Sequence, residues 1–64
     1  MRIKYLKNYC FSTHGDLQMA VLYDYNSQKV IDTGTVDGII ERNGEFELTR
    51  IQAHDDELIL EVRL

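Results

Sequence analysis

The chain has 64 residues, of which 44% are hydrophobic, and its seven basic and eleven acidic side chains give a net charge of −4. A chain of this length forms one domain and lies near the lower limit at which a hydrophobic core alone supports folding. The only cysteine, Cys10, excludes an internal disulfide. We therefore predict that residues 1–64 are a single small domain that gains stability by forming a homodimer.

The region after Met1 contains no apolar run long enough for a signal peptide or a membrane span. This composition predicts a cytoplasmic protein. The charge is uneven along the chain, because residues 1–30 carry four basic and two acidic side chains, whereas residues 31–64 carry three basic and nine acidic ones.

The first half of the chain shows the alternation of apolar and polar residues that is typical of β-strands. Residues 1–11 alternate with one exception on each face, residues 12–16 form a turn by composition, and residues 17–25 alternate again. A helix over residues 17–25 with Asp16 as its N-cap is the alternative, although Asp24 interrupts the apolar stripe of that helix. A turn over residues 26–29 then leads to a short strand over residues 30–33.

Asn43 and Gly44 lie between two alternating stretches, residues 35–42 and 45–53. Asn-Gly in this position is the strongest short-range signal for a two-residue hairpin loop, and it predicts a type I′ turn with both residues at positive φ. The buried side of the strand after this turn changes near Thr49, and the strand before it shows the same change around Gly38. The predicted hairpin must therefore bend there, with a bulge at Gly38.

A second two-residue loop at Asp55 and Asp56 predicts a last strand over residues 58–64. This register places apolar residues opposite apolar residues and a basic residue opposite an acidic one. The predicted pairs are Ala53 with Leu58, Ile51 with Leu60, Arg50 with Glu61 and Thr49 with Val62.

Five or six short strands with tight connections make an antiparallel meander. The predicted fold class is therefore all-β, a small five- or six-stranded meander that closes into a barrel or forms a strongly bent sheet. The segments expected at the edges are residues 30–33 and 59–64.

Residue types that carry catalysis or bind metals are few in this chain. Cys10 and His14 span a strand end and a turn, and no second pair of ligands has the usual metal-site spacing. The acidic stretch after His54, which includes Asp55 and Asp56, is explained by the solubility and turn geometry of a hairpin tip. We expect no metal, no cofactor and no enzymatic activity.

An apolar surplus is the most informative feature for function. Four aliphatic residues fall on strand faces that the alternation otherwise assigns to polar residues, and a chain this small has little core in which to enclose them. They predict contact with another protein, so we expect a non-enzymatic protein–protein interaction module, such as a small regulator or inhibitor subunit. These predicted protein-binding residues are Leu6, Leu22, Ile40 and Ile59.

Two alternatives involve nucleic acid. A small barrel could bind single strands through basic and aromatic residues of its first strand, although the alternation splits this cluster between two faces. In the other alternative, the nine carboxylates of residues 31–64 imitate a phosphate backbone and inhibit a nucleic-acid-binding protein. The residues of the first alternative are Arg2, Lys4, Tyr5, Lys7 and Tyr9.

Overall fold

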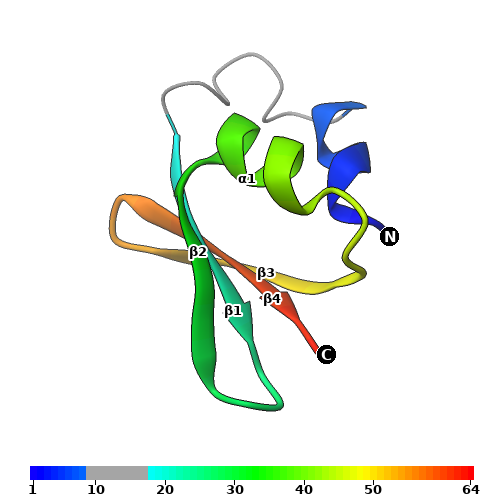
Figure 1. Cartoon of the computed structure of the whole chain (residues 1–64). Coiled ribbons are helices and arrows are strands. Elements are labelled where there is room, and N and C mark those ends of the chain that lie inside the picture. The colour runs from blue at the N-terminus through cyan, green and yellow to red at the C-terminus, as the bar shows by residue number, and fades with distance from the viewer. Residues whose placement is uncertain (9–17) are drawn as a thin grey trace.

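A mixed four-stranded sheet with one α-helix packed on it forms the body of the computed structural model, which describes residues 1–8 and 18–64 (Figure 1). None of the helices in these residues is long and apolar enough to cross a membrane. In chain order the elements are the 3-10 helix η1 (Ile3–Asn8), β1 (Met19–Asp24), β2 (Lys29–Thr35), α1 (Val36–Asn43), β3 (Leu48–His54) and β4 (Glu57–Val62).

Two antiparallel hairpins lie side by side in this sheet. The strand order is β2-β1-β4-β3, and the two central strands, β1 and β4, are parallel to each other. Strands β2 and β3 form the two edges, so α1 connects one edge to the other across one face of the sheet (Figure 1). The expected edge at residues 30–33 is confirmed, whereas residues 59–62 lie in the central strand β4.

The core lies between the sheet and the two helices. Alternate residues of β1 are buried, and they form one cluster with buried residues of β4, α1 and η1. Both helices contribute residues spaced three apart, which places those side chains on one helical face. The core residues are Ile3, Leu6, Ala20, Leu22, Val36, Ile39, Ile40, Leu48, Leu60 and Val62.

The predicted all-β fold is wrong. The chain is an α/β domain, and its sheet is open, neither closed into a barrel nor strongly curled. A meander joins each strand to its neighbour in sequence, but here β1 pairs with β4 in parallel. Two parallel neighbours require a crossover, and α1 lies within that crossover.

The predicted hairpin at Asn43 and Gly44 is also wrong, because the segment before it is helix α1. The Thr35 hydroxyl accepts a hydrogen bond from the Gly38 amide at 3.1 Å, which caps the first turn. Val36 and Ile39 are both buried, so the change of face around Gly38 reflects a helical period and not a bulge.

Gly44 caps the C-terminal end of α1, with φ −59° and ψ −22° instead of the positive φ expected for a type I′ turn. A Cβ atom at this position would lie 2.8 Å from the carbonyl oxygen of Ile40. The position therefore favours glycine because of close backbone approach.

The predicted first strand is replaced by η1 over the residues that the structure describes. Arg2 forms a single antiparallel bridge with Glu47, and the chain then turns into the 3-10 helix. Ile3 and Leu6 both enter the core, a spacing of three that fits this helix. Residues 9–11 of that predicted strand and the predicted turn at residues 12–16 lie outside the described residues.

The remaining predicted strands are confirmed in part, because β3 begins at Leu48 and β4 ends at Val62. Residues 19–24 form strand β1 and not the alternative helix, and β2 contains residues 30–33. Asp55 has φ +54° in the loop between β3 and β4. The register of that hairpin agrees with the prediction for three pairs, but a bulge at Thr49 pairs Leu48 with Val62 in place of the fourth.

The cap of α1 provides a test of the helical assignment. Replacing Thr35 by alanine removes the acceptor of the Gly38 amide and should lower the free energy of unfolding by about 1 kcal/mol. Thr35→Ser retains the hydroxyl and serves as the matched control. Denaturant unfolding of both variants measures the difference, and equal stability of the alanine and serine variants would contradict the capped helix.

Candidate functional site

One face of the sheet is covered by helices, and we call the other the helix-free face. The strand registers arrange its side chains in three rows that cross the sheet from β2 to β3. The first row is Thr35, Met19, Glu57 and His54; the second is Thr33, Val21, Ile59 and Gln52; the third is Val30, Tyr23, Glu61 and Arg50.

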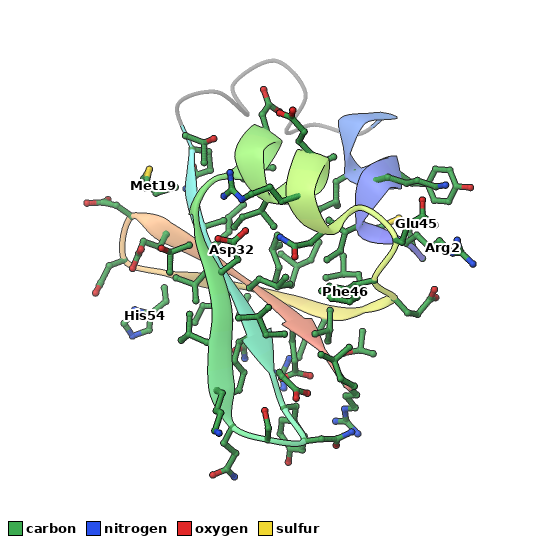
Figure 2. The ribbon with its side chains drawn as sticks, in the orientation of Figure 1. Arg2, Met19, Asp32, Glu45, Phe46 and His54 are labelled. Atoms are coloured by element: carbon green, nitrogen blue, oxygen red, sulfur yellow. The ribbon has the colours of Figure 1, made fainter. Side chains whose placement is uncertain are left out.

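An apolar strip occupies the centre of this face. Strand β1 contributes Met19, Val21 and Tyr23 to it, and Ile59 of β4 lies beside Val21. The Met19 side chain, labelled in Figure 2, is 45% exposed, while the other three are half-buried. A central strand that presents only apolar residues to its uncovered face differs from the usual alternation, in which the uncovered face is polar.

An aromatic and basic group lies at one end of the helix-free face. The guanidinium of Arg63 stacks over the ring of Tyr25, 4.4 Å from its centroid, and the Tyr25 amide donates to the carbonyl of Val62 at 2.9 Å. Arg50 ends the third row on β3 and forms no ion pair with any described residue. We call Arg50 and Arg63 the basic end.

An acidic group lies at the opposite end, where the β3–β4 loop turns. Glu57 is in the first row, and Asp55 and Asp56 precede it in the loop. The His54 Nδ1 atom is 3.5 Å from the Asp55 carboxylate, and Gln18 donates to the Asp56 carbonyl at 2.9 Å. We call Asp55, Asp56 and Glu57 the acidic end.

The buried carboxylate of Asp24 fixes the chain around the basic end. It accepts hydrogen bonds from the Ser27 hydroxyl at 2.6 Å and from the amides of Asn26 and Leu64 at 3.1 Å each. Ser27 and then Leu64 are the main causes that lower the pKa of Asp24 below its usual value of 3.8. Because these bonds tie the β1–β2 turn to the chain after β4, they position Tyr25 and Arg63 next to each other.

The structure separates the four predicted protein-binding residues. Leu6, Leu22 and Ile40 are buried in the core, so the prediction that they face outward is wrong for these three. Ile59 lies on the helix-free face. Leu22 was predicted to be an exception on a polar face, but it lies on the covered side of β1, together with Ala20.

The described side chains of the predicted nucleic-acid site make contacts within the chain itself. Arg2 and Lys4 both donate to the Glu45 carboxylate, Lys4 at 3.0 Å. Figure 2 shows Arg2 beside Glu45. Lys4 and then Arg2 lower the pKa of Glu45, and Lys4 also lies 5.5 Å from the centre of the Tyr5 ring. The side chain of Lys7 and all of Tyr9 lie outside what the structure describes.

The candidate metal ligands Cys10 and His14 also lie outside the described residues. Within residues 1–8 and 18–64, no three His, Cys, Asp or Glu side chains are grouped to hold a metal ion. A cavity of about 360 Å³ lies beside the C-terminal end of α1, with Ile40 and Phe46 in its wall and the Lys4–Glu45 ion pair at its edge.

Comparison with known proteins does not identify a family for this chain. No family model matches the chain, and neither the curated proteins nor the solved structures include a significant match.

The Asp24 network predicts how stability depends on pH. Because the folded state lowers the pKa of Asp24, its contribution is complete above about pH 4 and is lost as the pH falls through the lower, folded value. Asp24→Asn should be less stable than the wild type at pH 7, and its stability should fall less steeply below pH 4. Urea unfolding between pH 2 and pH 7 measures both slopes; parallel curves would contradict this role for Asp24.

Proposed function

We propose that the protein is a non-enzymatic protein–protein interaction module that binds through its helix-free face. The observation that carries this proposal is the apolar strip on the two central strands, uncovered by any described element. Removing such a strip from water is favourable, and contiguous apolar patches with polar borders are typical of docking surfaces.

The composition of the helix-free face supports the proposal. Its centre combines tyrosine, methionine and isoleucine, while arginine, threonine and glutamine lie toward the edges. Tyrosine, methionine and arginine are enriched in protein interfaces, and lysine, which is depleted there, occupies none of the twelve positions in the three rows. The rigid sheet also presents these side chains with little loss of backbone entropy on binding.

Nucleic-acid binding fits the surface less well. Arg2 and Lys4 both form ion pairs with Glu45, and the two arginines of the helix-free face share it with Glu57 and Glu61. A phosphate-binding surface needs an excess of positive charge, since its affinity comes from displaced counterions.

Imitation of a phosphate backbone is also disfavoured. Four of the nine carboxylates in residues 31–64 are in ion pairs with basic groups of the chain itself. Those four are Asp32, Glu45, Glu47 and Glu61.

Affinity capture from the native host tests the proposed function. Val21→Lys and Ile59→Lys place a charge in the apolar strip without altering the core, so both should lose the bound proteins, identified by mass spectrometry after nuclease treatment. Tyr5→Lys is the control, because Tyr5 is an exposed aromatic residue that lies on η1 and not on the helix-free face. Capture that survives both strip variants, or that disappears with nuclease, would contradict the proposal.

A further inference from the structure

We propose that Asn43 is a site of spontaneous deamidation that the folded protein keeps closed, and that reaction there irreversibly loosens the contact between α1 and β2. Asn43 is followed by Gly44, and the two residues supply the reacting groups. The main-chain nitrogen of Gly44 attacks the side-chain Cγ of Asn43, ammonia leaves, and a five-membered succinimide ring forms. Water then opens the ring to an aspartate or an isoaspartate. A following glycine favours the attack because it has no Cβ to obstruct the approach.

The folded protein holds the Asn43 side chain away from the Gly44 nitrogen. Its Nδ2 atom donates to the Asp32 carboxylate of β2 at 2.8 Å and to the carbonyl oxygen of Ile39 at 3.3 Å. The Asp32 side chain points toward α1 in Figure 2. Ile39 lies one turn back along α1, the direction in which helical side chains lean, whereas the Gly44 nitrogen lies on the C-terminal side. Ring closure therefore requires both hydrogen bonds to break.

The backbone at the end of α1 also opposes ring closure. The helix ends at Asn43, and Gly44 continues it with φ −59° and ψ −22°. The carbonyl of Asn43 accepts a hydrogen bond from the Phe46 amide at 3.1 Å, and the carbonyl of Gly44 accepts one from the Lys4 amide at 3.0 Å. The main chain is thus fixed on both sides of the attacking nitrogen. Reaction proceeds only from molecules in which this end of the helix has opened.

Reaction replaces a hydrogen-bond donor by an acceptor at the contact with β2. The aspartate product places its carboxylate against the Asp32 carboxylate and the Ile39 carbonyl, where neither has a proton to share. Two carboxylates at this distance repel each other, and Asp32 already pairs with Arg42 at 2.8 Å. The isoaspartate product lengthens the main chain just before Gly44, whose carbonyl holds Lys4. Neither product restores the original contact, so the end of α1 stays loosened.

Incubation of the whole chain at neutral pH, followed by peptide mapping with mass spectrometry, tests whether folding protects Asn43. Deamidation there should be about tenfold slower or more in buffer than in urea, because it proceeds only from opened molecules. Asp32→Ala removes an acceptor of the amide and should accelerate the reaction severalfold in buffer. Arg42→Ala is the matched control, since it removes another partner of Asp32 but leaves the carboxylate that holds Asn43. No deamidation in urea, equal rates in buffer and urea, or equal rates for the two variants would each overturn the proposal.

A double-mutant cycle tests the loosened contact. Asn43→Asp reproduces the aspartate product and should unfold at a lower urea concentration than the wild type at neutral pH. Adding Asp32→Asn exchanges donor and acceptor, so it should recover part of this loss. Asn26→Asp is the control, because Asn26 donates to the Leu64 carbonyl at 2.9 Å in a different part of the fold, and Asp32→Asn should recover none of its loss. An Asn43→Asp variant as stable as the wild type, or one that Asp32→Asn does not rescue, would refute the loosening.

Discussion

The parallel pairing of β1 with β4 is the constraint on which the rest of this structure depends. Two parallel neighbours cannot be joined by a tight turn, so the chain must leave the sheet, cross it and return. In this protein the crossover runs from one edge strand to the other and contains α1 (Figure 1). The described part of this 64-residue chain contains a single α-helix, and that helix lies in the crossover. It therefore covers only one face of the sheet.

The same constraint explains how charge is distributed. Most ion pairs lie where the helices join the sheet: Arg42 of α1 donates to Asp32 of β2, and the N-terminal segment is fixed by Glu45 and Glu47. Arg42 first and Asn43 next lower the pKa of Asp32. These contacts are exposed and individually weak, so they orient the crossover more than they stabilise it. Among the other charged residues, Arg50, Asp55, Asp56 and Glu57 lie toward the two ends of the helix-free face, whereas Asp37 and Glu41 lie on α1.

A covered and an uncovered face also give a physical reason for the proposed binding through the helix-free face. Ten apolar residues in the described part of the chain are buried in the core, a small number for a domain whose single cysteine excludes an internal disulfide. Packing a second layer against β1 and β4 would bury their outer side chains as well. Both faces of the central strands would then be removed from water, as they are in strands inside larger proteins.

Local features whose signal is complete within a few residues could be predicted from the amino-acid sequence. Alternation identified β1, the register of β3 with β4 followed from three cross-strand pairs, and the change of face near Thr49 marked a real bulge. Features that depend on contacts between distant parts of the chain could be recognised only in the tertiary structure. Val36, Ile39 and Ile40 fit a bent strand or a short helix equally well until the Thr35 cap and the crossover are known. Likewise, alternation shows that β1 has two faces but not which is covered, because that depends on where α1 packs. This is why Leu22 was assigned to the surface, and why the helix-free face emerged only from the assembled sheet.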